Sequence, residues 1–169
     1  MQDTFNRVLL ILVSTFLLHA CSVTDNKKHL LQNVVDEYYT VYSERTDFER
    51  FMAFYDEQAQ LEDIIYGNSL NNKKEIRTFF AWDKGQFEML AGKPVLTISK
   101  QVIDGRNVIT EGYFNQFKYN GQVLGPWLFV IVHQFNDKYK IIKQTDWINY
   151  TPRKQFLGGK NMNQGLHEK

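Results

Sequence analysis

The chain is poor in the residues that carry disulfide, metal or cofactor chemistry. Its 169 residues include a single cysteine. No internal disulfide can therefore form, and the fold must depend on its hydrophobic core. The histidines and acids show none of the spacings typical of a metal site, and no glycine-rich loop joins a predicted strand to a predicted helix. We therefore expect neither a metal nor a cofactor.

An excess of one charge is also missing. Lysine and arginine together number 20 against 19 aspartates and glutamates, which leaves a net charge of +1. Nucleic-acid-binding proteins usually carry a strong basic field. We therefore expect no nucleic-acid partner.

Aromatic residues, in contrast, are abundant. The chain is 43% hydrophobic and 15% aromatic, with 13 phenylalanines and 9 tyrosines. This length and composition suit one domain with an aromatic core, which favours a sheet over a helical bundle.

The N-terminal segment is predicted to lie outside that domain. Residues 8–18 form an uninterrupted apolar run behind Arg7, about as long as the core of a signal peptide and shorter than the ~20 residues of a membrane span. The run ends in LLHAC, which resembles a bacterial lipobox and implies cleavage before Cys21 and lipidation of its thiol. An ordinary secretory signal and an uncleaved anchor remain alternatives.

The resulting division of the chain has four parts. We predict a lipoprotein signal peptide at 1–20, a polar tether at 21–30, one domain at 31–150 and a flexible tail at 151–169. Ser22 follows the cysteine, and in this class of signal it implies sorting to the outer membrane, facing the periplasm. The expected partner is therefore a membrane, reached through lipidated Cys21 in a bacterial cell envelope.

Periodicity predicts three helices in the first half of the domain. Thr46 and Glu49 form a capping-box pattern at the start of the second helix, and Asn72 with Glu75 marks the start of the third. A short extended stretch, residues 59–66, lies between these two helices and ends at Gly67. The apolar face of the first helix consists of Leu31, Val34, Val35, Tyr38, Val41 and Tyr42.

The second half has the composition of strands. Segments rich in β-branched and aromatic residues are separated by the turn dipeptides Asp104-Gly105, Asn120-Gly121 and Asn136-Asp137. Short connections imply antiparallel neighbours. Helices followed by an antiparallel meander predict the α+β class. The predicted strand segments are 95–103, 107–119, 125–135 and 139–150.

This order of elements, with FYDEQAQLEDIIYG and KKEIRTFF in the middle, resembles the nuclear transport factor 2-like superfamily, which includes SnoaL-like proteins and ketosteroid isomerase. The matching parts are Tyr38 on the first helix, AFYDEQAQLED, Gly67 and KEIRTFF, and the resemblance spans residues 31–150. It implies a cone in which N-terminal helices pack in a strongly curved antiparallel sheet with a pocket at one end. One fold of this kind hosts many chemistries.

The resemblance also implies candidate catalytic residues. The isomerase's V-E-D segment aligns with LED, which places the catalytic base at Asp63 and the pocket tyrosine at Tyr38. The family's proton-donating aspartate falls near Ile131, an apolar residue, and the loss of such a donor removes much of the transition-state stabilisation. Steroid isomerase activity itself is therefore not expected, and Asp146 remains as a possible partner of Asp63.

Strand alternation in the family's register gives the expected lining of the pocket. The side chains expected to bind a ligand are Tyr42, Glu111, Tyr113, Asn115, Trp127, Phe129, His133 and Gln144. Structural roles are the alternatives. Asp63 can cap the turn before Gly67, with Glu62 solvated, and Asp146 can accept structural hydrogen bonds. His133 can be a core histidine, Glu111 can lie at the sheet edge, and the tyrosines can simply pack.

Two classes of function follow. The first is a lipid-anchored module whose pocket binds a small apolar molecule or a partner protein without catalysis; it is favoured because the second acid is missing. The alternative is a cofactor-independent lyase, isomerase or hydrolase with Asp63 as general base. A closed, aromatic-filled cone with Asp63 bonded to backbone amides would exclude the enzyme, whereas an open pocket with Asp63 and Asp146 convergent and depleted of solvent would favour it. In either case a homodimer through the outer face of the sheet is plausible.

Overall fold

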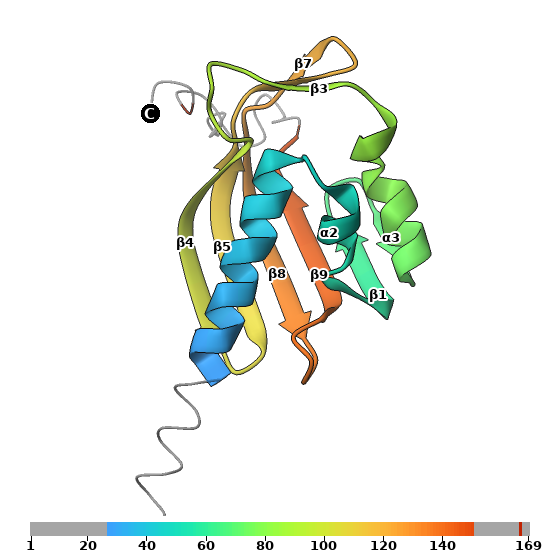
Figure 1. The fold of residues 1–169 in the computed structure, drawn as a ribbon, viewed down its shortest axis with the longest axis vertical. Helices are drawn as coiled ribbons and strands as arrows, with labels where there is room; N and C mark the ends of the chain where they lie inside the picture. Colours follow the sequence, from blue (N-terminus) through green and yellow to red (C-terminus); the bar gives the residue numbers. More distant parts are fainter. Residues whose placement is uncertain (1–26, 151–165, 167–169) are drawn as a thin grey trace, which may run out of the picture.

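The computed structural model describes residues 27–150 and Leu166 (Figure 1). The predicted signal peptide, Cys21 and the predicted tail other than Leu166 lie outside the described residues. Residues 27–44 are helical, so the N-terminal helix includes residues 27–30, which the sequence assigned to the tether. Its predicted apolar face is confirmed, because Leu31, Val35, Tyr38 and Tyr42 are buried.

Two shorter helices follow the N-terminal helix. Helix α2 (Phe48–Met52) begins at Asp47, whose carboxylate accepts a hydrogen bond from the backbone N–H of Arg50. The sequence-based prediction of Thr46 as the capping residue is therefore wrong by one position. Helix α3 (Lys73–Phe80) begins as predicted, because the Asn72 side chain accepts from the Glu75 N–H at 2.9 Å. A 3-10 turn, η1 (Trp82–Lys84), comes next.

The large sheet has six strands in the order β2-β1-β9-β8-β5-β4. The antiparallel meander predicted from the second half is confirmed by the ladders β4–β5, β5–β8 and β8–β9. The strands are β1 (Tyr55–Asp63), β2 (Asn68–Leu70), β4 (Leu96–Asp104), β5 (Asn107–Phe114), β8 (Trp127–Phe135) and β9 (Ile141–Ile148). A small second sheet contains β3 (Phe87–Met89), β6 (Phe117–Tyr119) and β7 (Gln122–Leu124).

Strand β1 departs from the sequence-based expectation. It begins at Tyr55, earlier than the predicted extended stretch, and it pairs in parallel with β9, so the sheet is mixed and not purely antiparallel. The polar run from Asp56 to Gln58 hid the first half of this strand. Because β1 and β9 run side by side, Asp63 and Asp146 become neighbours in the ladder.

The helices cover one face of the curved sheet and form a cone with it. Figure 1 shows the N-terminal helix lying across β5 and β8, with α2 and α3 beside β1. The enclosed core is largely aromatic, and many of its ring pairs are T-shaped: Tyr38 contacts Phe54, and Phe51 contacts Phe80, both edge to face. Such pairs add to the free energy of burying their area.

At one position of β5, the neighbouring strand and the core leave no room for a side chain. A Cβ atom at Gly112 of β5 would lie 2.3 Å from the Thr97 carbonyl oxygen and 2.8 Å from the Phe129 ring. The Thr97 oxygen belongs to the neighbouring strand's backbone and cannot move aside without disturbing the ladder. Gly112 is therefore required by packing.

We predict that Gly112→Ala lowers the free energy of unfolding by about 1–3 kcal/mol, the usual range for overpacking. Urea denaturation of the described domain measures this change. Glu111→Ala is the matched control, because Glu111 is the adjacent residue and is exposed. Equal stability of the wild type and the Gly112 variant would contradict the packing argument.

Candidate functional site

An interior cavity of about 200 Å³ opens between the C-terminal end of the N-terminal helix, α3 and the small sheet. Its walls are mainly aromatic, and Asp146 is the single carboxylate among the described residues that line it. We call this space the interior cavity. It is lined by Tyr42, Arg45, Phe79, Phe80, Trp82, Phe114, Phe117, Tyr119, Leu124, Trp127, Asp146, Ile148 and Tyr150.

A buried hydrogen-bond network adjoins the cavity and centres on Gln144. The Gln144 side-chain oxygen accepts from the Tyr55 hydroxyl at 2.6 Å and from the Tyr38 hydroxyl at 3.4 Å. Nε2 of His133 lies 3.1 Å from the same oxygen. Gln144 in turn donates from Nε2 to Oδ1 of Asp146 at 2.8 Å. Asp146 is thus tied to three buried side chains through a single amide.

His133 is neutral in this network. Burial lowers the pKa of His133 from 6.5 to about 4, and the hydrogen bond that His133 donates to Gln144 opposes this only in part. Since the Gln144 oxygen can only accept, Nε2 of His133 carries the proton, and its Nδ1 atom has no partner among the described residues. His133 is therefore the core histidine that the sequence left as an alternative, and it does not line the interior cavity.

Asp146 is a carboxyl group in an apolar environment. Burial raises the pKa of Asp146 from 3.8 to about 7; the Gln144 hydrogen bond lowers it, and the charge of Asp63 raises it further. Its cross-strand partner on β8 is Ile131, which is fully buried. Ile131 occupies the position at which the isomerase resemblance implies a second acid. Its apolar side chain therefore shields Asp146 from water and offers it no hydrogen-bond donor.

Asp63 is bound by the turn that follows it. Its Oδ1 atom accepts from the backbone N–H groups of Ile65 at 3.1 Å and Tyr66 at 3.3 Å, and its Oδ2 atom accepts from the Asn68 amide at 3.2 Å. The backbone oxygen of Asp63 accepts from Gly67 N–H at 2.8 Å, which closes the turn. Asp63 is buried, but it does not line the interior cavity.

The three candidate catalytic residues therefore do not meet at one point. Tyr38 is part of the Gln144 network, Asp63 caps its own turn, and Asp146 alone lines the cavity. Burial and the neighbouring tyrosines raise the pKa of Tyr38 well above its usual value, so its hydroxyl stays neutral. Asp63 and Asp146 are ladder neighbours whose carboxyl groups interact through charge, and the next residue, Ile64, donates its backbone N–H to the Asp146 carbonyl oxygen at 3.0 Å.

The predicted ligand-binding residues do not share one location. Tyr42 and Trp127 line the cavity, and His133 and Gln144 form the adjoining network. Phe129 is packed in the core against Phe114. Asn115 is used structurally, because its amide donates to the Pro94 carbonyl oxygen at 2.8 Å and to Thr97 Oγ1 at 2.9 Å.

The inward orientation predicted for Glu111 and Tyr113 is wrong. Along β5 the buried positions are Val108, Thr110, Gly112 and Phe114, so Glu111 and Tyr113 are on the outer face. Glu111 lies 3.9 Å from Lys100 there. A register error of one residue exchanges the two faces of a strand, and nothing in NVITEGYF distinguishes the small residues Thr110 and Gly112 as the inward pair.

Arg45 and several aromatic residues of the cavity were not predicted from the sequence. Phe114 lies on the strand segment whose register was misjudged, and Tyr150 follows the end of β9. Phe117, in contrast, was expected to point inward, and it does line the cavity. Arg45 lies between Glu44 and Thr46 in a polar connection that resembles an ordinary exposed loop. In the structure it is only partly exposed and forms part of the cavity wall.

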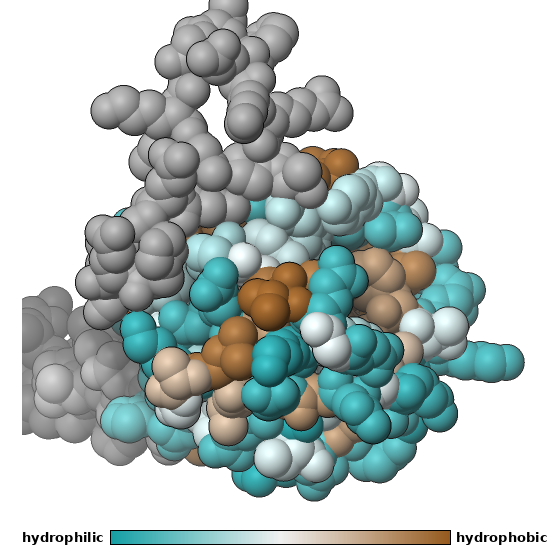
Figure 2. All heavy atoms as spheres, turned by 90° about the horizontal axis from the view of Figure 1, so that it is seen from above, coloured by the Kyte–Doolittle hydropathy of each residue, from teal (hydrophilic) through white to brown (hydrophobic). Residues whose placement is uncertain are grey.

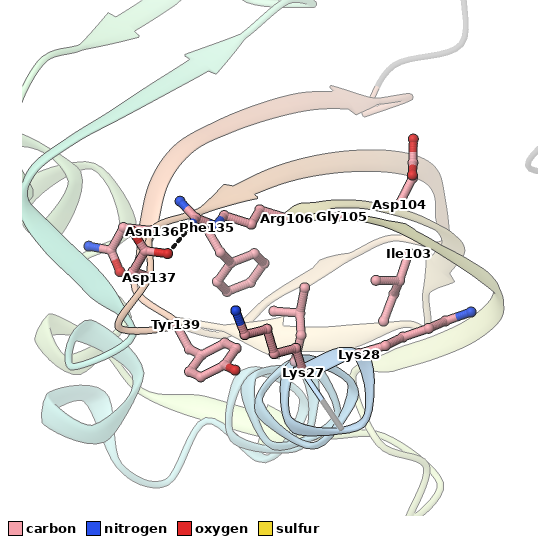
Figure 3. A pocket seen from close by; sticks show the side chains of 11 residues that line it. Lys27, Lys28, Ile103, Asp104, Gly105, Arg106, Phe135, Asn136, Asp137 and Tyr139 are labelled. Atoms are coloured by element: carbon pink, nitrogen blue, oxygen red, sulfur yellow. Dashed lines mark ion pairs between the residues drawn. The ribbon is translucent and has the colours of Figure 1, made fainter. Parts of the chain in front are cut away.

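A second cavity, of about 480 Å³, lies at the end of the molecule where the N-terminal helix meets the β4–β5 and β8–β9 turns (Figure 3). Leu31, Ile103, Phe135 and Tyr139 provide apolar walls, and lysines, Arg106 and aspartates surround them. Arg106 forms an ion pair with Asp137 across one side, marked by the dashed line in Figure 3. It contains none of the predicted site residues.

Within residues 27–150 no group of three His, Cys, Asp or Glu side chains could hold a metal ion. No described helix has the length and apolar character needed to cross a membrane. Figure 2 shows the end that carries β3 and β7 from above, with separate hydrophobic areas among polar ones.

No protein-family model matches the chain, and no curated protein matches it. Solved structures do match. An NTF2-like protein of unknown function from Burkholderia xenovorans LB400 superimposes with a TM-score of 0.55 at 17% identity, covering 76% of this chain and 89% of that protein. An LEH-like epoxide hydrolase of M. tuberculosis superimposes with a TM-score of 0.54 at 15% identity, covering 69% of this chain and 80% of that protein.

A third similar structure is a protein with a ketosteroid isomerase-like fold from Catenulispora acidiphila DSM 44928, in complex with trimethylamine. Its TM-score is 0.53 at 15% identity, covering 68% of this chain and 83% of that protein. At such low identities the similarity concerns the fold alone. The protein therefore has the α+β, cone-shaped nuclear transport factor 2-like fold, as the sequence resemblance implied.

The buried carboxyl group of Asp146 predicts how stability depends on pH. The unfolded chain loses this proton near pH 3.8 and the folded chain near pH 7, so the folded state loses stability as the pH rises between these values. Relative to the wild type, Asp146→Asn should gain stability across this interval, by at most about 4 kcal/mol at 1.36 kcal/mol per pKa unit.

The measurement is the free energy of unfolding in urea for both proteins at about pH 5 and about pH 8. Asp104→Asn removes an exposed carboxylate and controls for the change in net charge. A difference between the Asp146 variant and the wild type that does not change with pH would contradict the buried environment of Asp146.

Proposed function

We propose that the protein is a lipid-anchored cell-envelope module whose interior cavity binds a small apolar molecule without catalysis. The observation that carries this proposal is that the oxygens of Asp63 are bound by the Ile65–Asn68 turn, while the cavity is walled by aromatic rings. Pockets lined by apolar side chains with a few polar groups are the usual form of small-molecule sites.

The geometry of Asp63 argues against the alternative, an enzyme with Asp63 as general base. A general base needs an oxygen within hydrogen-bond reach of the substrate proton. Both oxygens of Asp63 are already acceptors, and the side chain is not part of the cavity wall. To act as a base, Asp63 would have to give up the hydrogen bonds that close the turn.

Asp146 supplies the polar group that orients a ligand. Because its pKa is raised to about 7, a large fraction of Asp146 is protonated near neutral pH and can donate a hydrogen bond. The cavity volume of about 200 Å³ is below the roughly 300–1,000 Å³ of pockets for drug-sized molecules. The expected ligand is therefore about as large as a single ring.

The test of binding is native mass spectrometry of the protein purified from its host. Leu124 of β7 lines the cavity, whereas its neighbour Val123 is exposed. Leu124→Trp should fill the opening and lower the occupancy of any co-purified molecule by about tenfold or more, and Val123→Trp should leave it unchanged. Equal occupancy in the two variants would contradict the interior cavity as the site.

The same preparation separates binding from catalysis. Asp63→Asn keeps one acceptor oxygen for the backbone N–H groups of Ile65 and Tyr66 and should retain the bound molecule. If the wild type converts that molecule and Asp63→Asn does not, Asp63 is a catalytic base and the non-catalytic proposal is wrong.

The anchor is part of the proposal through the LLHAC signature, since Cys21 lies outside the described residues. Cys21→Ser should prevent incorporation of a labelled fatty acid and move the protein from the membrane fraction to the soluble fraction. The wild type expressed in a bacterium is the reference. Labelling that persists in the variant would exclude Cys21 as the lipidated residue.

The homodimer remains a prediction. The outer face of the sheet exposes apolar residues that include Val102, Ile109, Val130 and Trp147.

A further inference from the structure

Arg45 occupies a backbone position that does not suit its residue type. It directly follows the N-terminal helix, and its N–H donates to the Val41 carbonyl oxygen at 3.0 Å, which ends the helix. Its φ angle is 52°, in the left-handed region. Helices that end this way usually have glycine at this position, because a Cβ atom is unfavourable there. The side chain of Arg45 must therefore offset a backbone cost.

The guanidinium group of Arg45 is surrounded by aromatic rings. Its central carbon lies 4.8 Å from the ring centre of Phe117, 5.3 Å from that of Phe87 and 5.4 Å from that of Tyr42. These distances allow cation–π attraction, which compensates in part for the loss of water around the charge. The rings hold the guanidinium in place beside the interior cavity, whose wall Arg45 helps to form.

Arg45 has no counter-charge within the described residues. The other described arginines each form an ion pair: Arg50 with Glu37, Arg77 with Glu49 and Arg106 with Asp137. Arg45 forms none, and its Nε atom is buried without a hydrogen-bond partner among those residues. Burial lowers the pKa of Arg45, and the nearby Tyr42 hydroxyl opposes this lowering only in part.

A partly buried cation without an anion is costly unless something else supplies the negative charge. Among the described lining residues only Asp146 is acidic, and it forms no ion pair with Arg45. Arginine is well suited to bind a carboxylate through two parallel hydrogen bonds, and the Nε–H group of Arg45 is without a partner among the described residues. The missing partner can therefore come from a bound molecule.

We propose that the ligand of the interior cavity carries an anionic group, such as a carboxylate, that binds Arg45 while its apolar part lies against Phe80, Phe114 and Trp127. This inference rests on the proposed function and specifies the chemical class of its ligand. At about 200 Å³ the cavity suits a carboxylate on one aromatic ring or a short acyl chain. Asp146, as a hydrogen-bond donor, can bind a second polar atom of the same molecule.

The test compares two probes of equal size, benzoate and the uncharged benzamide. Their dissociation constants are measured by isothermal titration calorimetry at neutral pH and low salt, where charge-assisted contacts are least screened. Wild-type protein should bind benzoate about tenfold more tightly than benzamide or better. This comparison needs no variant, so it remains decisive even if changes at Arg45 affect folding.

Variants identify the residue responsible. Arg45→Met should remove the preference for benzoate and leave benzamide binding within about twofold, whereas Arg45→Lys should keep part of the preference. Arg77→Met is the matched control: Arg77 also lies over a ring, 4.8 Å from the centre of Phe48, but it is outside the cavity. The Arg77 variant should retain the full preference.

The outcomes separate the two proposals. Equal binding of benzoate and benzamide by the wild type would overturn the role of Arg45 and leave an apolar binding cavity in place. A preference for benzoate that survives Arg45→Met would also overturn it. If the wild type binds neither probe at millimolar concentration and no molecule co-purifies with it, both the anionic ligand and the proposed function are wrong.

Discussion

The side-chain oxygen of Gln144 is the polar contact on which the interior of the cone depends. Two tyrosine hydroxyls and one histidine nitrogen from three different elements meet at this atom. In an aromatic core each of these groups would be costly without a partner. The N-terminal helix, β1, β8 and β9 can therefore pack together only when Gln144 is in place, and its amide nitrogen then determines the position of Asp146.

Two aspartates that are neighbours in the β1–β9 ladder have different environments for this reason. Asp63 is the last residue of β1, and the turn after it supplies backbone N–H groups to its carboxylate. Asp146 lies within β9 opposite the buried Ile131, where it is itself buried and accepts a hydrogen bond from the Gln144 amide. The first is a structural acceptor, and the second is the polar group of the cavity.

The wall of the interior cavity is formed by residues that are far apart in the chain. Arg45 ends the N-terminal helix, Phe79 and Phe80 end α3, and Tyr150 follows β9. Arg45 and Asp146 are the basic and the acidic residue among the described lining residues, and most of the remaining wall is aromatic. This distribution distinguishes the cavity from the larger one at the opposite end, where Arg106 is paired with Asp137.

Local patterns in the sequence were sufficient for the class of fold, the helix that starts at Asn72 and the four-stranded meander, because apolar periodicity and turn residues act over a few positions. The parallel pairing of β1 with β9, the one-residue register of β5 and the partners of Asp63 depended on contacts between distant segments. Arg45 shows the same limit: in the sequence it is one charged residue in a polar loop. Only the packing of Phe87 and Phe117 around its guanidinium, from strands far along the chain, makes it part of the cavity wall.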